Sequence, residues 1–386
     1  MSGKITVGIV FGGKSAEHEV SLRSAKNVFD AIDRDKYDPV LIGIDKSGRW
    51  LLNRSERFPA GGAVSGGGAA ALVPGSGSVY VANAGRDRPA ENPNGAGSAG
   101  KRGCIVDLSA SGAAGGELVL DVVFPILHGP FGEDGTVQGF LKLADLPFVG
   151  AGVLGSAVGM DKDVMKRLLR DGGIPIGRYR ALRSHEKLPD FAALTEELGL
   201  PLFIKPANMG SSVGVSKVRT GEEFAAAVSG AFEYDAKIVI EEFIQGRELE
   251  CSVLGNEDPA ASLPGEIIPS HDFYSYEAKY LDEKGASLEI PAKLSPEKTG
   301  EVQRLAIQTF RTLCCEALAR VDFFMKADGT ILVNEINTMP GFTKISMYPK
   351  LWEASGLPYT RLIDKLIELA LLRSEKEKKL KISFTL

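Results

Sequence analysis

Two acidic side chains in the last third of the chain are spaced so that they could face each other across a β-hairpin. Residues 321–325 and 331–337 have the apolar content of two strands, and the Asp-Gly dipeptide at 328–329 is typical of a two-residue hairpin turn. Counting outward from that turn places Asp322 opposite Glu335 on one face of the sheet. Two facing carboxylates repel each other and are costly to desolvate, so we expect a cation between them.

The same register predicts the other groups of a metal site. Arg320 falls opposite Asn337 on the face that carries Asp322 and Glu335. Carboxylate and amide oxygens, without histidine or cysteine, suit Mg²⁺, which is commonly shared with nucleotide phosphates. We therefore predict that Asp322, Glu335 and Asn337 are metal ligands. The alternative is an ordinary hairpin with a solvated polar face, and a bulged turn would shift the pairing.

A candidate phosphate site lies in the middle of the chain, where a predicted strand ends in a lysine. Residues 205–214 read Lys-Pro-Ala-Asn-Met-Gly-Ser-Ser-Val-Gly, and such a loop can present amides and hydroxyls, including that of Ser212, to a polyphosphate. Lys162 and Lys205 supply positive charge. Alone this is a weak signal, because a Gly-Ser turn between strands is commonly only a hairpin connection.

The next predicted strand carries a candidate nucleoside site. It ends in Glu241 and Glu242, and the following Phe243 and Ile244 form an apolar hinge against which a base could stack. Glu248 lies a few residues further on as a partner for the ribose. Each of these residues also has a simpler interpretation as part of the surface.

One match to a known pattern is misleading. Residues 8–15 fit the P-loop expression, but residues 9–11 continue an apolar run that starts before Gly8, whereas in a P-loop the first glycine ends the strand. A P-loop kinase therefore stays only as an alternative, for which Lys14 would be essential.

Length and composition indicate a multidomain enzyme with small-molecule partners. A chain of 386 residues is too long for one ordinary core, so two or three domains are expected. A net charge of -5 with mixed signs gives no basic surface for nucleic acid or anionic lipid. We expect no signal peptide, because residues 5–11 read as a buried strand, and no apolar stretch approaches membrane-spanning length. The four cysteines fit neither a disulfide framework nor a zinc site. We expect a cytoplasmic protein.

The pattern of elements predicts an α/β protein. Strands at 5–11 and 40–44 flank a helix and form a βαβ opening, and a buried strand at 118–124 delivers the loop at 128–135. The Gly/Ala/Ser-rich stretch at about 59–116 is interpreted as an insertion, with strand-like segments at 79–81 and 104–108. Further on, the sequence predicts strands at 202–205, 213–218, 238–243, 249–254 and 265–269, a loop at 271–287, and helices at 302–317 and 362–370.

Six segments, in order, resemble signatures of the D-alanine:D-alanine ligases. They are residues 11–21, 127–135, 160–162, 205–214, 276–280 and 334–341, and the resemblance runs from residue 5 to about 372, except for the insertion. It implies the ATP-grasp fold, with an N-terminal doubly wound parallel α/β domain (1–155), a central domain (156–250) and a C-terminal domain (251–386). It places ATP between the last two domains.

The resemblance also implies a reaction and its partners. ATP would phosphorylate the carboxylate of one D-alanine, and the amine of a second D-alanine would attack the acyl phosphate, for peptidoglycan precursor synthesis. Two Mg²⁺ ions, or Mn²⁺ instead, would serve the phosphoryl transfer. A homodimer is expected. The alternatives are a D-alanine:D-lactate ligase, another ATP-grasp carboxylate-amine ligase, or a nucleotide-binding regulatory protein that has lost its chemistry.

Residue roles follow from the same resemblance. Glu17 would bind the ammonium of the first D-alanine and hydrogen-bond with Ser211 and with Tyr280. Arg320 and the backbone N–H of Gly341 would stabilise the oxyanion of the tetrahedral intermediate.

The remaining assignments concern the ends of the substrates and of the nucleotide. His128 would help to orient the first substrate, and Ser346 with Lys344 would meet the carboxylate of the second. Relatives that make D-alanyl-D-lactate lack the Lys-Tyr pair that this chain retains at 279–280 (Lys279 and Tyr280), which favours a dipeptide product. The adenine would contact Glu241 and the backbone of 242–244, and the ribose would contact Glu248.

Overall fold

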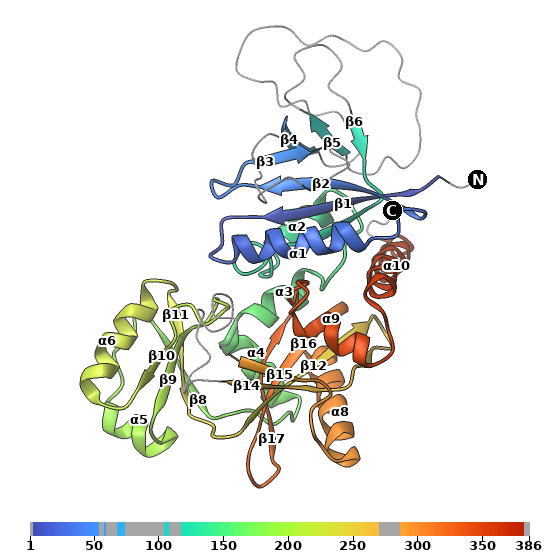
Figure 1. The fold of residues 1–386 in the computed structure, drawn as a ribbon. Helices are drawn as coiled ribbons and strands as arrows, with labels where there is room; N and C mark the ends of the chain where they lie inside the picture. Colours follow the sequence, from blue (N-terminus) through green and yellow to red (C-terminus); the bar gives the residue numbers. More distant parts are fainter. Residues whose placement is uncertain are drawn as a thin grey trace, which may run out of the picture.

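The computed structural model describes residues 3–53, 58, 68–73, 104–107, 117–269 and 286–381. The strands in this part of the chain form a seven-stranded, a four-stranded and a six-stranded sheet, with the N-terminal seven-stranded sheet at one end of the molecule and the other two beside each other at the opposite end (Figure 1). The mixed α/β character that the sequence predicts is confirmed.

The N-terminal sheet has the order β6-β5-β4-β3-β2-β1-β7. β1 (Ile5–Gly12) pairs in parallel with β2 (Tyr37–Ile44) on one side and with β7 (Val122–Ile126) on the other, and α1 (His18–Ala31) connects β1 to β2. The predicted βαβ opening is therefore confirmed. Because Gly8 lies inside β1 rather than at its end, the P-loop interpretation is wrong.

The other strands extend this sheet in antiparallel fashion. They are β3 (Trp50–Asn53), β4 (Gly68–Val73), β5 (Cys104–Asp107) and β6 (Glu117–Val119). β5 corresponds to the strand predicted at 104–108, β4 was not predicted, and 79–81 lies outside the described residues. The single strand predicted at 118–124 is two strands, because β6 pairs with β5 at one edge of the sheet and β7 (Val122–Ile126) pairs with β1 at the other. Between them, the Asp121 carboxylate accepts the Thr6 N–H at 2.9 Å.

Helices cover both faces of the parallel part of this sheet, so it is doubly wound. Val7 and Ile9 pack with α1, whereas Val10 packs with α2 (Thr136–Leu143) on the opposite face. This alternation is the period-two pattern of a strand that is buried on both sides.

The four-stranded sheet has the order β10-β9-β11-β8 and is antiparallel. α5 and α6 lie side by side against one face of it (Figure 1). Its elements are β8 (Tyr179–Arg183), α5 (Phe191–Leu198), β9 (Leu202–Pro206), β10 (Ser216–Val218), α6 (Gly221–Phe232) and β11 (Lys237–Glu242).

The third sheet has the order β15-β14-β12-β16-β17, with β13 (Ala260–Ala261) beside β12. Its strands are β12 (Arg247–Gly255), β14 (Gly265–Pro269), β15 (Ala286–Glu289), β16 (Ala317–Met325) and β17 (Ile331–Asn337). The helices around it are α3 (Val153–Met160), α4 (Lys162–Asp171), α8 (Pro296–Thr312), α9 (Met347–Ala354) and α10 (Tyr359–Glu377).

Two details of this region bear on the predictions. β12 begins at Arg247, so the predicted domain boundary at 250 falls inside a strand of the third sheet. The helix predicted to reach residue 317 ends at Thr312, because Cys314 has a φ of 54° and Ala317 already starts β16.

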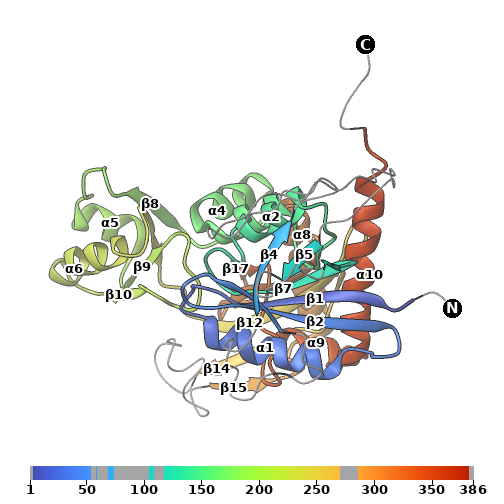
Figure 2. The same cartoon turned by 90° about the horizontal axis from the view of Figure 1, so that it is seen from above.

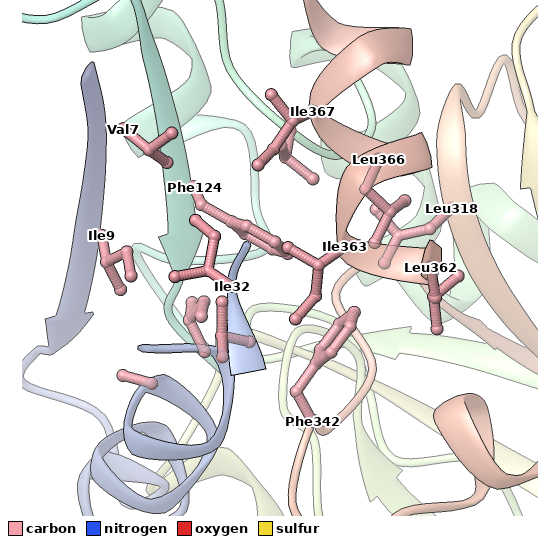
Figure 3. Close-up of a cluster of buried hydrophobic side chains, with 14 of the residues drawn as sticks. Val7, Ile9, Ile32, Phe124, Leu318, Phe342, Leu362, Ile363, Leu366 and Ile367 are labelled. Carbon is pink, nitrogen blue, oxygen red and sulfur yellow. The ribbon is translucent and has the colours of Figure 1, made fainter. Parts of the chain in front are cut away.

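The longest helix of the C-terminal region joins the N-terminal sheet to the third sheet. Figure 3 shows Leu362, Ile363, Leu366 and Ile367 of α10 in one apolar cluster with Phe124 of β7, and Leu318 and Phe342 enter the same cluster. From above, α10 lies alongside the N-terminal sheet (Figure 2). No helix in the described ranges is long and apolar enough to cross a bilayer.

Candidate functional site

The predicted facing of the two acidic residues is confirmed. Asp322 on β16 pairs with Glu335 on β17, and Arg320 pairs with Asn337. The predicted two-residue turn is wrong, however, because the strands end at the pair of Met325 with Ile331 and the hydrogen bond between Lys326 and Thr330 leaves three residues, 327–329, in the loop.

A compensating irregularity restores the expected register. The loop closes with a hydrogen bond from the Lys326 N–H to the Thr330 carbonyl at 2.9 Å, and Gly329 has a φ of 84°, as in three-residue hairpins that end in a left-handed glycine. Further along, Asn334 is an extra residue, because Phe323 pairs with Val333 while the pair before it is 322 with 335. The two one-residue offsets cancel where the acidic residues meet.

Arg320 lies at the centre of the charges on this face. Its Nε is 2.7 Å from Asp322 Oδ1 and 2.8 Å from Glu250 Oε2, and its Nη2 donates to Asp322 Oδ2 at 2.8 Å. Although burial opposes the charged form, these two carboxylates and then Glu335 raise the pKa of Arg320 well above its ordinary value. The guanidinium therefore stays charged and fixes the Asp322 side chain.

The donor set on this face fits a hard divalent cation that is shared with a phosphate. Asp322 and Glu335 supply carboxylate oxygens, and Asn337 donates its Nδ2 to Asp322 Oδ2 at 3.0 Å, which leaves its amide oxygen for other partners. No cluster of three or more His, Cys, Asp or Glu side chains with metal-site geometry occurs in the described ranges. A magnesium ion here would complete its coordination with phosphate oxygens and water, as Mg²⁺ usually does.

Two lysines flank a buried glutamate beside this face. Lys205 Nζ is 2.6 Å from Glu241 Oε2, and Lys166 Nζ is 3.1 Å from Glu241 Oε1. Burial would raise the pKa of Glu241, but Lys166 and Lys205 lower it to about 2. For Lys205, burial opposes the charged form, but Glu241 and then Glu335 raise its pKa. The Lys205 ammonium therefore stays charged beside the sheet face that carries Asp322, Glu335 and Asn337, which we call the metal face.

Lys162 connects the Gly/Ser loop to the metal face. It is the first residue of α4, and its Nζ donates to the Met209 carbonyl at 2.7 Å and lies 3.7 Å from Glu335 Oε2. The structure thus brings together Lys162 and Lys205, which the sequence predicts as phosphate-binding residues, although 43 positions separate them in the printed sequence.

The Gly/Ser loop also reaches the N-terminal domain. The Ser211 hydroxyl hydrogen-bonds to Glu17 Oε1, as the resemblance implies. Ser211 and Ser212 have φ values of 51° and 61°, which non-glycine residues adopt rarely. Such backbone strain is often found at ligand-binding loops. Lys279 and Tyr280, the other predicted residues of this closure, lie outside the described residues.

The nucleoside end has an aromatic surface with a cation beside it. Phe243 is 40% exposed and stacks on Phe203, with ring centroids 6.0 Å apart, and Lys217 Nζ lies 4.8 Å from the Phe243 centroid. The Glu242 carboxylate accepts the backbone N–H and Nε of Arg178 at 2.7 and 2.8 Å, so its side chain is already bound. Only the backbone of Glu242 then suits the predicted adenine contact.

Ile244 and Glu248 border the same end. Ile244 packs so close to Gly177 that a Cβ there would lie 2.7 Å from Ile244 Cδ1. Glu248 lies on β12 and pairs with Phe324 across to β16. Ile244 therefore lies in the connection between β11 and β12, and Glu248 lies near the start of β12.

The predicted substrate end lies at the loop after β17. A Cβ on Gly341 would be 2.7 Å from Ser346 Oγ, so only glycine leaves both groups in place. Ser346 Oγ accepts the Thr343 N–H at 3.0 Å. Lys344 does not join Ser346; it is exposed and lines a separate cavity of about 350 Å³ with Asp30.

His128 and Glu133 lie where the N-terminal domain meets this loop. His128 is 4% exposed, and its Nδ1 is 3.0 Å from the Met339 carbonyl. The Glu133 carboxylate accepts the Gly129 N–H at 2.6 Å and the Met339 N–H at 3.2 Å. Burial, and then the charge of Glu17, raises the pKa of Glu133 to about 8.

Comparison with known proteins identifies the family. The model for the D-ala D-ala ligase N-terminus matches residues 6–151, and that for the D-ala D-ala ligase C-terminus matches residues 168–368. The chain belongs to the D-alanine–D-alanine ligase family. It is 52% identical over 382 residues to a D-alanine–D-alanine ligase of Oceanobacillus iheyensis, covering 98% of this chain and 99% of the relative. It is 50% identical over 383 residues to the D-alanine–D-alanine ligase A of Escherichia coli strain K12, with coverage of 98% and 99%.

Solved structures agree with this assignment to the D-alanine–D-alanine ligase family. The D-alanine–D-alanine ligase of Coxiella burnetii superposes with a TM-score of 0.81 at 39% identity, covering 97% of this chain and 96% of that structure. A D-Ala:D-Ser ligase of Enterococcus faecalis superposes with a TM-score of 0.77 at 34% identity, covering 95% and 100%. The expected ATP-grasp fold is therefore confirmed.

Several residues of the site were not predicted from the sequence. Lys166 stands one helical turn after Lys162, and this i,i+4 spacing could have indicated a second lysine on the same helix face. Glu250 lies two residues after Glu248 on β12, but nothing in the local sequence indicates that Glu250 pairs with Arg320. Glu133 lies within the segment at 127–135 and gives no separate signal.

Proposed function

We propose that this chain ligates two D-alanine molecules with ATP, through an acyl phosphate, to give D-alanyl-D-alanine, ADP and phosphate. The observation that carries the proposal is the convergence of three groups from distant parts of the chain: Glu17 at the start of α1, the Ser211 loop with Lys205, and the facing pair of Asp322 and Glu335. The full-length similarity to D-alanine–D-alanine ligases supports it.

Phosphoryl transfer is assigned to the charged groups between the second and third sheets. Lys162 and Lys205 would neutralise phosphate oxygens of ATP, because the Lys162 ammonium lies 3.7 Å from Glu335 and the Lys205 ammonium lies 2.6 Å from Glu241. Asp322, Glu335 and Asn337 would hold Mg²⁺, with Mn²⁺ as an alternative. When bound, the metal would supply charge neutralisation at the transferring phosphoryl group.

The acyl end of the reaction is assigned to the N-terminal domain and the loop after β17. Glu17, fixed by Ser211, would bind the ammonium of the first D-alanine. The Gly341 N–H and Arg320 would stabilise the oxyanion that forms when the second amine attacks, and Ser346 would meet the second carboxylate. His128 would help to orient the first substrate indirectly, by holding the backbone carbonyl of Met339.

The nucleoside end is assigned to the aromatic surface on the second sheet. The adenine would stack on Phe243 with Phe203 beneath it and contact the backbone from Glu242 to Ile244. Glu241 is bound by two lysines, so its contribution would be to hold Lys205 in place. Glu248 would accept the ribose hydroxyls.

The second substrate is the finest part of the proposal. The Lys279–Tyr280 pair favours an amine over D-lactate. The likeness to a D-Ala:D-Ser ligase makes D-serine the competitor to test. We further propose a cytoplasmic homodimer that supplies the dipeptide for peptidoglycan.

A product assay tests the proposal. Phosphate release and dipeptide are measured with ATP, Mg²⁺ and D-alanine, with L-alanine as the stereochemical control, and D-serine or D-lactate is then added to compete. We expect D-alanyl-D-alanine and one phosphate per dipeptide, with L-alanine inactive. Absence of phosphate release with every amino acid would reject the ligase assignment, and a mixed ester or D-alanyl-D-serine product would change the second substrate.

A further inference from the structure

The loop that carries Gly341 is fixed on both sides by hydrogen bonds from the N-terminal domain. On one side, the Met339 N–H donates to Glu133 and the Met339 carbonyl contacts His128 Nδ1 at 3.0 Å. On the other side, the Phe342 N–H donates to Ser24 Oγ at 3.2 Å. Within the described residues, the Gly341 N–H between them has no hydrogen-bond acceptor.

The phenyl ring of Phe342 anchors the same peptide in the core. It is fully buried and meets the Phe124 ring edge-on, with centroids 5.6 Å apart (Figure 3). The Phe342 carbonyl accepts the Tyr359 hydroxyl at 2.9 Å and the Asn27 side-chain amide at 3.2 Å. The residue that follows Gly341 is therefore held at its N–H, its carbonyl and its side chain.

The direction of each hydrogen bond in this chain follows from its ends. A backbone N–H can only donate, so Ser24 Oγ accepts from Phe342; a carbonyl can only accept, so His128 Nδ1 carries the proton that it donates to Met339. Burial lowers the pKa of His128, so the ring is neutral and its Nε2 is an acceptor. The Ser24 hydroxyl, 3.2 Å away, consequently donates to Nε2.

We propose that Ser24, with His128, is a positioning residue that holds the Gly341 N–H in the orientation required to stabilise the oxyanion of the second half-reaction. Ser24 is 0% exposed and lies on α1, and His128 uses both ring nitrogens within the protein, so neither needs to touch a substrate. The inference rests on the proposed function, because the oxyanion is the one formed when an amine attacks the acyl phosphate.

The test is the coupling between dipeptide formation and phosphate release in Ser24→Ala. Without the Ser24 hydroxyl, the peptide group between Gly341 and Phe342 can rotate, and because both groups share the Gly341 Cα, the Gly341 N–H becomes misaligned. The second amine then attacks more slowly and acyl phosphate hydrolyses instead. We expect kcat for dipeptide to fall about tenfold, a part of the roughly 10²–10³ that loss of an oxyanion donor causes. Dipeptide formed per phosphate should fall well below one, while KM for ATP stays unchanged.

A matched control separates positioning from general loss of stability. Ser156→Ala also removes a hydroxyl that is 1% exposed, but its hydrogen bond, to the Ala151 carbonyl, stays within its own segment. This variant should keep one dipeptide per phosphate even if its Tm falls as far. Tyr359→Phe, which removes one of the two hydrogen bonds to the Phe342 carbonyl, should uncouple in the same direction as Ser24→Ala and provides the test if that variant does not fold.

The outcomes are distinct. Uncoupling in Ser24→Ala or Tyr359→Phe, with Ser156→Ala coupled, supports the inference. If Ser24→Ala and Tyr359→Phe, where they fold, still form one dipeptide per phosphate, the inference is overturned. A wild-type chain that forms no dipeptide from D-alanine would instead reject the proposed function.

Discussion

Glu335→Gln is the sharpest test of the metal face, because it changes one charge and almost no volume. Around Arg320 and Lys162 the structure gathers three carboxylates, those of Glu250, Asp322 and Glu335, which leaves one net negative charge. The substitution removes that charge. A unit-charge pair about 4 Å apart contributes about 4 kcal/mol at an effective dielectric constant near 20, which corresponds to roughly 10³ in an equilibrium constant. The remaining amide oxygen keeps part of the coordination, so we expect the Mg²⁺ concentration for half-maximal activity to rise about 10²-fold or more.

The assay is dipeptide formation as a function of Mg²⁺ at saturating ATP and D-alanine, for wild type and variant. Glu301→Gln is the control, since Glu301 pairs with Lys298 at 2.8 Å on α8 and such partly exposed pairs contribute about 1 kcal/mol or less. It should leave the Mg²⁺ dependence unchanged. If Glu335→Gln retained the wild-type Mg²⁺ dependence and a kcat within about threefold, the stated Coulomb estimate would not apply and the metal assignment would be wrong.

Three further predictions concern the charged groups around the site. In Lys166→Met, Glu241 keeps one lysine, and the free energy of unfolding should fall by about 3 kcal/mol at neutral pH. Because the pKa of Glu241 in the folded protein is lowered from 4.5 to about 2, its contribution is present above 4.5 and lost as the pH falls toward 2; urea unfolding should therefore show the wild-type advantage shrinking in acid. Glu133 has a pKa of about 8, so its contribution is complete below its ordinary value of 4.5 and is lost as the pH rises through 8. In a series of Tm measurements against pH, Glu133→Gln should remove that decline in stability. If the decline between pH 4.5 and 8 were the same in the variant, the raised pKa of Glu133 would be contradicted. Ser211→Ala should raise KM for D-alanine about tenfold through the lost hydrogen bond to Glu17, with KM for ATP within about twofold, as initial rates would show.

The sequence predicts the strands of the site better than their ends. Apolar runs bounded by turn residues located β9, β11, β12 and β17, because burial on the sheet determines their composition. The end of α8 was missed, since Cys314 and Ala317 adopt positive φ values that their residue types do not indicate. Contacts between distant segments carry even less local signal: the Ser24 to Phe342 bond spans 318 positions, and Ser24 looks like any polar residue in an amphipathic helix.

The hairpin shows why a correct pairing can follow from an incorrect turn. Side chains alternate across a strand, so an offset of one residue would send Glu335 to the opposite face from Asp322. The three-residue loop introduces that offset, and the extra residue at Asn334 removes it before Glu335 is reached. Composition could not indicate the bulge, but the proposed metal site requires it, because the two carboxylates would have to share a face to bind one cation. With a three-residue loop at Gly329, the hairpin therefore needs one bulge between the loop and the pair of Asp322 with Glu335.

The same reasoning separates the two ends of the proposed reaction. The acyl end is built from the loop at 339–342, which is bonded to Glu133, His128 and Ser24 and shares a core with α10. The phosphate end is built on the second sheet, and the hydrogen bond from Ser211 to Glu17 links its loop to the N-terminal domain. A rigid donor at the acyl end suits a reaction in which nucleotide must enter and leave while the oxyanion site stays aligned. Substitutions that loosen the first end should therefore uncouple the two half-reactions, whereas substitutions of the phosphate-binding Lys162 or Lys205 at the second end should change nucleotide affinity and leave coupling intact.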